Sequence, residues 1–177
     1  MRPWRRRTGA GSVVDRKYKA MVTRIFVHGL DSSNRGTKAT FFREYYPDMI
    51  LPNFPGSLEE RMQILREVLD GKRDIVLVGS SFGGLMATLF ALEHEERVRR
   101  LVLLAPALNF ADQSSLAGKV LSVPTWIYHG TKDDVIPLQD VKDIGQRLFK
   151  KLTFVVLDDD HNLHSTFTEL PWEELLA

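Results

Sequence analysis

Ser81 is the residue whose surroundings most clearly indicate chemistry, because it is central to a G-x-S-x-G motif at 79–83. An apolar run, Ile75–Val78, precedes the motif, and a stretch typical of a helix begins at Phe82. Between a strand and a helix, this motif holds the serine at the apex of a sharp turn, with glycines where a Cβ would clash. A serine hydroxyl is a poor nucleophile without a base. The motif therefore predicts a nucleophilic serine with a histidine and an acid nearby.

The base must come from one of five histidines. His28 and His129 each precede a glycine directly after a predicted strand, and we interpret them as structural residues that satisfy backbone groups of the loops. His94 lies near the far end of the helix that follows the motif and is predicted to be a surface residue. His161 and His164 follow the last predicted strand, so they are the two candidates for the base.

The acid that orients the imidazole is predicted in the stretch HGTKDDVIP at 129–137, which follows a predicted strand. This stretch contains two candidates, Asp133 and Asp134. With Asp133 and His161, the chain order is serine, acid, histidine. Asp133 lies 52 residues after Ser81, and His161 lies 28 residues after Asp133. That order is typical of one of the several unrelated folds that assemble these three groups.

Two other chemistries could use the same residues. A glycine-rich turn before a helix can cradle phosphate, but no lysine follows this turn, and Gly36-Thr37-Lys38 lacks the Walker spacing and residue order. His161 and His164 with an aspartate could ligate a divalent ion, but H-x-x-H on a loop lacks fixed ligand geometry. We therefore predict no metal site and no cofactor.

Short apolar runs alternate with helical stripes from Met21 onward, which predicts parallel βαβ units. Strands that are apolar on both faces indicate a sheet covered on both sides. The predicted fold is therefore a three-layer α/β/α sandwich with a parallel sheet of about six strands, whose carboxyl ends carry the reactive residues. Strands are predicted at 22–27, 48–51, 74–78, 98–104, 124–128 and 153–157. Helices are predicted at 37–46, 58–69, 82–93, 138–149 and 165–176, the last interrupted or restarted at Pro171.

The composition excludes several classes of protein. Apolar residues make up 44% and charged residues 27% of the 177, as is usual for a soluble globular domain. The absence of cysteine excludes a disulfide scaffold, a thiolate metal site and a cysteine nucleophile, and it is compatible with the cytoplasm, the predicted location. No run of 18 apolar residues occurs, so no membrane-spanning helix is predicted.

Charge is distributed unevenly along the chain. Residues 1–20 hold seven basic residues and one acid, which gives +6, whereas the other 17 bases and 22 acids give −5. A basic arm can bind nucleic acid or a membrane surface, but terminal segments are commonly loose. We therefore interpret 1–20 as a disordered N-terminal extension, predict a single domain at 21–177, and predict no nucleic-acid partner.

Four segments carry a resemblance to a known family: HGLDSS at 28–33, GSSFGG at 79–84, HGTKDDVIP at 129–137 and DHN at 160–162. Together they resemble the α/β-hydrolase fold superfamily, and more narrowly its small lidless bacterial esterases of the YqiA-like and dienelactone-hydrolase-like type. The resemblance runs from about residue 22 to residue 165. Three departures stand out: the first two strands of the full fold are missing, no large insertion separates Leu104 from Val120, and three aspartates precede His161.

The resemblance implies roles for individual residues. In that family the H-G after the first core strand opens the oxyanion-hole loop, and the residue after the glycine, here Leu30, donates its N–H. The residue after the nucleophile, Phe82, is the second donor. The family acid in H-G-x-x-D-x-x-V/I-P falls on Asp133, and the family histidine after the last strand falls on His161.

The predicted function is that of a serine hydrolase, which cleaves a carboxylic ester or thioester of a small or medium-sized substrate through an acyl-enzyme on Ser81. Loops 30–36 and 105–119 are predicted to wall an open site, with Leu108 and Phe110 as substrate-binding residues. The alternative is a weakly active or inactive hydrolase-fold protein that binds or regulates a partner. A peptidase or amidase would use the same residues. The sequence does not fix the oligomeric state.

Overall fold

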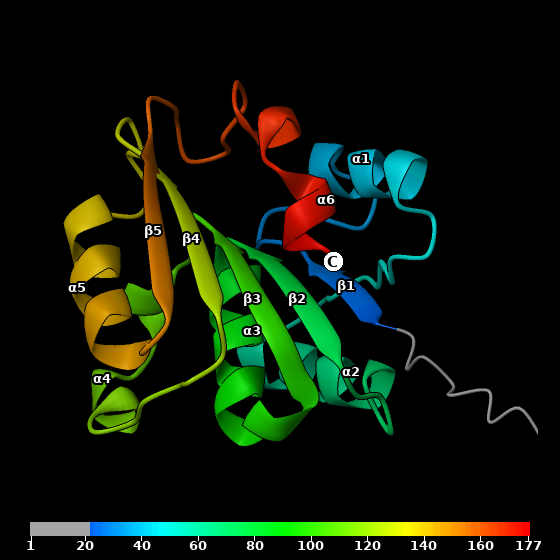
Figure 1. Cartoon of the computed structure of the whole chain (residues 1–177), viewed down its shortest axis with the longest axis horizontal. Coiled ribbons are helices and arrows are strands. Elements are labelled where there is room, and N and C mark those ends of the chain that lie inside the picture. Colours follow the sequence, from blue (N-terminus) through cyan, green and yellow to red (C-terminus); the bar gives the residue numbers. More distant parts are fainter. Residues whose placement is uncertain (1–21) are drawn as a thin grey trace, which may run out of the picture.

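The computed structural model describes residues 22–177, and the predicted basic extension at 1–20 lies outside them. The described residues form one five-stranded sheet in the order β1-β2-β3-β4-β5, with every neighbouring pair parallel (Figure 1). The predicted parallel α/β sheet is confirmed. The stretch 48–51 makes only a single bridge, between Ile25 and Ile50, instead of a sixth strand. The strands are Thr23–Val27, Ile75–Ser80, Val98–Leu104, Thr125–Gly130 and Leu152–Leu157.

The described chain has six α-helices and three 3₁₀ turns, of which the last turn and the last helix follow β5. Helix α2 begins with a capping box, in which the Ser57 and Glu60 side chains each accept from the other's backbone N–H. The C-terminal stretch 165–176 consists of a 3₁₀ turn and a short helix, with the break at Pro171 that the sequence predicts. The helices are α1 (Thr37–Tyr45), α2 (Leu58–Val68), α3 (Phe82–Glu93), α4 (Gln113–Leu116), α5 (Leu138–Leu148) and α6 (Trp172–Leu175). The 3₁₀ turns are Glu95–Arg97, Leu108–Phe110 and Phe167–Glu169.

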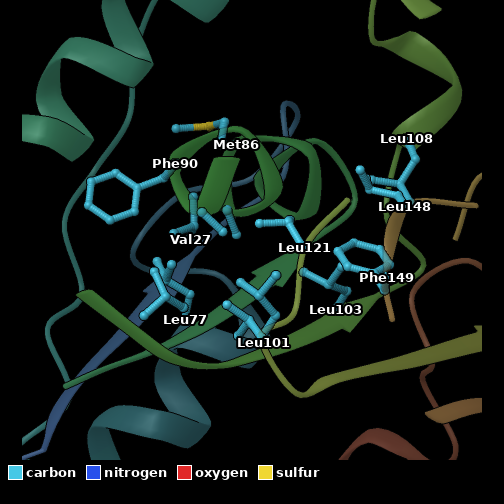
Figure 2. Packing of buried hydrophobic residues seen from close by; sticks show 14 of the residues in the cluster. Val27, Leu77, Met86, Phe90, Leu101, Leu103, Leu108, Leu121, Leu148 and Phe149 are labelled. Atoms are coloured by element: carbon cyan, nitrogen blue, oxygen red, sulfur yellow. The ribbon is translucent and has the colours of Figure 1, made fainter. Parts of the chain in front are cut away.

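Alternate residues of the strands pack into two separate cores, one on each face of the sheet. On β2, Ile75 and Leu77 pack in the core that α2, α3 and α5 cover, part of which Figure 2 shows. Val76 and Val78 face the opposite core, which α1 and α6 cover. Helices therefore lie on both faces, which accounts for strands that are apolar throughout. No helix within 22–177 is both long enough and apolar enough to cross a membrane.

The parallel register aligns the carboxyl ends of the strands along one edge. Val27 at the end of β1 pairs with Gly79, and Ser80 at the end of β2 pairs with Leu104. At the far side, Gly130 at the end of β4 pairs with Leu157 at the end of β5. The loops that follow β1, β2, β4 and β5 therefore start from the same edge, and these are the loops that carry the four motif segments.

Candidate active site

Ser81 lies in the turn between β2 and α3, in a backbone conformation that side-chain-bearing residues rarely adopt (φ 53°, ψ −118°). Hydrogen bonds hold this conformation on both sides. The Ser81 N–H donates to Leu104 O at 2.9 Å, and Ser81 O accepts from the N–H groups of Gly84 at 2.9 Å and Ala107 at 3.0 Å. A strained residue persists only where its surroundings over-determine it. Here Leu104 at the end of β3 and Ala107 in the loop after it hold Ser81 in this conformation.

Glycines flank this turn because backbone atoms occupy the space that a side chain would need. A Cβ at Gly79 would lie 2.5 Å from Gly83 O and 2.7 Å from Gly84 Cα. A Cβ at Gly83 would overlap Val27 O and lie 2.6 Å from Val27 C. The obstructing atoms are backbone atoms and cannot rotate away. The two glycines thus let α3 start directly against the ends of β2 and β1, as the motif predicts.

His161 lies between Ser81 and Asp133. Its Nε2 is 3.0 Å from Ser81 Oγ, and its Nδ1 is 2.7 Å from Asp133 Oδ2. A carboxylate only accepts hydrogen bonds, so Nδ1 carries the imidazole proton and Nε2 is left as an acceptor for the serine hydroxyl. An imidazole in this tautomer can take the hydroxyl proton as the oxygen attacks an electrophile.

The Asp133 carboxylate is fully buried and fixed by its own loop. Its Oδ1 accepts from the N–H groups of Val135 at 2.9 Å and Ile136 at 2.8 Å. Its Oδ2, which faces His161, also lies 3.2 Å from His129 Nε2. Asp134, the other candidate from the sequence, is exposed. The turn at 133–136 therefore brings Asp133, and not its neighbour, to the imidazole.

The three aspartates before His161 have partners other than that imidazole. Asp159, for example, caps the backbone of 165–166 and accepts from the Thr166 hydroxyl at 2.8 Å. His164, the other candidate base, is exposed and binds an aspartate of its own. The remaining pairs are Asp158 with Lys132 at 2.8 Å and Asp160 with His164 at 2.6 Å. The acidic cluster thus shapes the loop that carries His161.

The N–H groups of Leu30 and Phe82, the two implied oxyanion donors, lie next to Ser81 in the chain or in space. Phe82 is the first residue of α3, where the positive end of the helix dipole lies. A Cβ at Gly29, the residue before Leu30, would be 3.4 Å from Ser81 Cβ. Within residues 22–177, neither N–H group donates a hydrogen bond. Both are therefore free to bind an oxygen of a ligand.

A cavity of about 500 Å³ opens in front of Ser81 and His161. The loop at 29–38 forms one wall, as predicted for 30–36, and the segment 161–168 forms the other. No residue of 105–119 lines the cavity. The apolar part of the lining consists of Phe26, Leu30, Val135, Leu163 and Phe167.

Leu108 and Phe110, the predicted substrate-binding residues, do not line this cavity. Leu108 has no exposed surface and belongs to the core on the α5 side (Figure 2). Phe110 is 64% exposed but lies outside the cavity. The physical reason is that the 3₁₀ turn Leu108–Phe110 packs its apolar side toward α5.

Lys38 is a residue of the cavity that sequence reasoning missed. Its Nζ donates to Asn162 O at 2.6 Å and lies 5.5 Å from the centre of the Phe167 ring. Burial lowers the pKa of this ammonium group. The contact ties α1 to the loop that carries His161. It joins positions 124 residues apart, so no local sequence pattern announces it.

Two histidines at this edge are buried and used structurally, as predicted. His28 Nδ1 lies 2.8 Å from Gly29 O, and His129 Nε2 lies 3.0 Å from Ile136 O. Burial is the main cause that lowers the pKa of both imidazoles below the ordinary value of 6.5. Both side chains are therefore neutral in the folded protein at pH 7.

These lowered pKa values predict a loss of stability in mild acid. Below about pH 6.5 these histidines bind protons in the unfolded chain. In the folded protein they bind protons only at a lower pH, because their pKa values are lowered there. The free energy of unfolding should therefore fall as the solution is acidified from neutral pH to about one unit below 6.5. In His129→Gln this fall should be smaller, as measured by urea unfolding at both pH values. His94→Gln, at a partly exposed position, should keep the wild-type slope, and an unchanged slope in His129→Gln would contradict the prediction.

Comparisons with known proteins agree with this fold. A family model described as the alpha/beta hydrolase fold matches residues 31–121, about half of the chain. The chain is also 37% identical over 82 residues to a pimeloyl-[acyl-carrier protein] methyl ester esterase of Vibrio cholerae. That match covers 44% of this chain and 31% of the esterase, so the chain spans about a third of the length of this relative.

Solved structures share the fold over most of the chain. A putative hydrolase of the alpha/beta superfamily from Xanthomonas campestris pv. campestris has a TM-score of 0.70 at 25% identity, with 84% of this chain and 91% of that one covered. Est1E from Butyrivibrio proteoclasticus, solved with ferulic acid bound, has a TM-score of 0.70 at 17% identity, with 88% and 86% covered. Sequence motifs, sheet topology and family model thus agree, and the chain belongs to the alpha/beta hydrolase fold family.

Proposed function

We propose that this protein is a serine hydrolase that cleaves a carboxylic ester or thioester through an acyl-enzyme on Ser81. The observation that carries the proposal is the continuous hydrogen-bonded chain from Ser81 Oγ through His161 to the buried Asp133. A hydroxyl, an imidazole and a carboxylate in this order form the arrangement that activates serine in acyl transfer.

The proposed reaction has two halves. Ser81 Oγ attacks the carbonyl carbon while His161 Nε2 takes the hydroxyl proton, and Asp133 stabilises the resulting imidazolium. Collapse of the tetrahedral intermediate breaks the bond to the leaving alcohol or thiol, which receives the proton from His161. A water molecule then gives its proton to His161 and attacks the acyl carbon, which releases the acid and restores the serine.

The negative charge on the carbonyl oxygen is proposed to be stabilised by the N–H groups of Leu30 and Phe82. Both groups are unpaired within the described chain and lie beside the serine. Loss of one such donor typically costs about 3–4 kcal/mol of transition-state stabilisation. The positive end of the α3 dipole adds to the same field.

The substrate is proposed to be small or medium-sized. A cavity of about 500 Å³ is large enough for such a substrate, and its lining combines apolar side chains such as Leu30 and Phe167 with many polar ones. The partial match to an esterase that acts on a methyl ester supports an ester as the substrate class. Esters are also chemically easier to cleave than amides.

The proposal is tested with a fluorophosphonate probe, which forms a covalent bond with an activated serine. The wild-type protein should be labelled at residue 81, and Ser81→Ala should not be labelled at all, because the attacking oxygen is gone. Ser80→Ala is the matched control, since it removes the adjacent hydroxyl and should leave labelling intact. Mass spectrometry of the labelled peptide reads the result. Equal labelling of wild type and Ser81→Ala would refute the proposal.

A panel of p-nitrophenyl esters of increasing acyl length separates an enzyme from the alternative of a binding or regulatory protein. Hydrolysis that disappears in Ser81→Ala supports the enzyme. A wild-type protein that cleaves no ester of the panel and resists the fluorophosphonate would favour the alternative.

A further inference from the structure

Arg61 is a buried cation on α2 for which the proposed reaction has no direct use. The residue is only 5% exposed, and it does not line the cavity in front of Ser81. No carboxylate within residues 22–177 lies within ion-pair distance of its guanidinium. A buried charge without an ion pair is costly unless hydrogen bonds compensate it. The groups that compensate Arg61 therefore point to its role.

The guanidinium donates to three backbone carbonyls. Nε donates to Gly56 O at 2.9 Å, Nη1 to Gly29 O at 3.4 Å, and Nη2 to Leu30 O at 3.2 Å. The last two carbonyls flank the N–H group of Leu30, which the proposed mechanism uses as an oxyanion donor. Arg61 thus holds the loop after β1 from behind, on the side away from the cavity.

Because a peptide bond is planar, the hydrogen bonds to Gly29 O also determine the direction of the Leu30 N–H. Gly29 O and the Leu30 N–H belong to the same planar trans peptide, so they point in opposite directions. Donors that fix Gly29 O therefore fix where the Leu30 N–H points. Hydrogen bonds to the carbonyl also polarise the peptide and make its N–H a stronger donor.

His28 is the second group that fixes the same carbonyl. Its Nε2 accepts from the Phe54 N–H at 3.0 Å, so the imidazole proton is on Nδ1. Nδ1 then donates to Gly29 O at 2.8 Å. The peptide between Gly29 and Leu30 is thus held by a short bond from His28 and a longer one from Arg61.

Arg61 also touches the other proposed donor residue. Its guanidinium carbon lies 5.6 Å from the centre of the Phe82 ring, within the range of a cation–π contact. One buried side chain on α2 therefore contacts both residues that are proposed as oxyanion donors, although these residues are 52 positions apart in the chain.

We propose that Arg61 is a positioning residue of the oxyanion hole, which with His28 sets the direction and strength of the Leu30 N–H donor and braces Phe82. This inference rests on the proposed function of Ser81. It assigns to Arg61 a role in transition-state stabilisation and none in holding the ground-state substrate.

The experiment compares Arg61→Lys and Arg61→Gln with Arg66→Gln. Arg66 lies on the same helix and pairs with Glu93 at 2.8 Å, away from the cavity. Activity is measured on the best p-nitrophenyl ester and normalised to the amount of protein that a fluorophosphonate labels at completion. Normalisation separates slower chemistry from a smaller folded fraction. A trifluoromethyl ketone, which forms a tetrahedral oxyanion adduct on serine, reports the oxyanion hole directly.

Complete loss of an oxyanion donor lowers kcat by about 10²–10³-fold. The Arg61 variants keep the Leu30 N–H but no longer hold it in one direction. We therefore expect kcat to fall about 10- to 100-fold, with KM nearly unchanged. The affinity for the trifluoromethyl ketone should fall by the same factor as kcat/KM. Arg61→Lys, which keeps the charge but cannot reach all three carbonyls, should fall between wild type and Arg61→Gln, and Arg66→Gln should match wild type.

Normalised kcat and ketone affinity at wild-type values in Arg61→Lys and Arg61→Gln would overturn the inference while leaving Ser81 as the nucleophile. If Arg61→Gln does not fold, Arg61→Lys decides alone. Absence of labelling in the wild type itself would instead overturn the proposed function, and this inference with it.

Discussion

Ser81→Ala is expected to lower kcat for ester hydrolysis by about 10⁶-fold, His161→Ala by a similar factor, and the double variant by no more than either single one. The reason is that the hydroxyl and the imidazole act as one unit. With the 3.0 Å contact between Ser81 Oγ and His161 Nε2 as the route for the proton, removal of either partner abolishes the activated nucleophile. The residual rate would come from the N–H donors and substrate binding.

The measurement is kcat for the three variants on one p-nitrophenyl ester, with circular dichroism to confirm folding. His94→Ala is the control, because that histidine is on the far end of α3 and only partly exposed. It should retain activity close to wild type. A double variant whose loss is the product of the two single losses would show that the two residues act independently, contrary to the proposed mechanism.

The turn at Ser81 could be predicted from the sequence because two local glycines mark it, although Leu104 and Ala107 also hold it. Gly79 and Gly83 are required where backbone atoms leave no room for a Cβ, so the motif itself records the close approach of α3 to β1 and β2. The position of Asp133 is also local in origin. The N–H groups of Val135 and Ile136, two and three residues ahead, orient its carboxylate. The spacing of residues within this one short motif therefore predicts the position of Asp133.

The second wall of the cavity, at 161–168, could not be predicted in the same way, because it depends on contacts between distant segments. The contact of Lys38 with the loop after His161 joins α1 to a segment near the C-terminus. The place of Leu108 after β3 favours a position at the cavity, yet the 3₁₀ turn directs its side chain into the core beside α5. An apolar residue after a strand can line the cavity or pack in the core, and the packing of the whole domain decides between the two.

The burial of Arg61 could be predicted from the sequence by a helical projection of α2. Leu58, Met62 and Leu65 form the apolar stripe of α2, and Arg61 lies on the same stripe, three residues after Leu58 and four before Leu65. A charged residue on the buried face of a helix needs partners there. The stripe predicts burial of the cation, but only the fold shows that its partners are the carbonyls beside Leu30.

Asp133→Asn is expected to lower kcat by about 10⁴-fold, because the substitution reverses the tautomer of His161. The structure fixes how the asparagine would lie. The N–H groups of Val135 and Ile136 require an acceptor at the Oδ1 position, so the carbonyl oxygen of the amide must stay there. The amide NH₂ then takes the Oδ2 position and faces His161 Nδ1, which lies 2.7 Å from that oxygen in the wild type.

An imidazole that accepts at Nδ1 carries its proton on Nε2 and cannot take the proton of Ser81. The loss should therefore appear in kcat and in the rate of fluorophosphonate labelling, with little change in KM. Asp134→Asn is the matched control, since the neighbouring carboxylate is exposed, and it should keep nearly full activity. If Asp133→Asn retained more than about a tenth of wild-type kcat, the Asp133 carboxylate would not set the tautomer, and the orienting role in the triad would have to be assigned to Asp134 or to another acid.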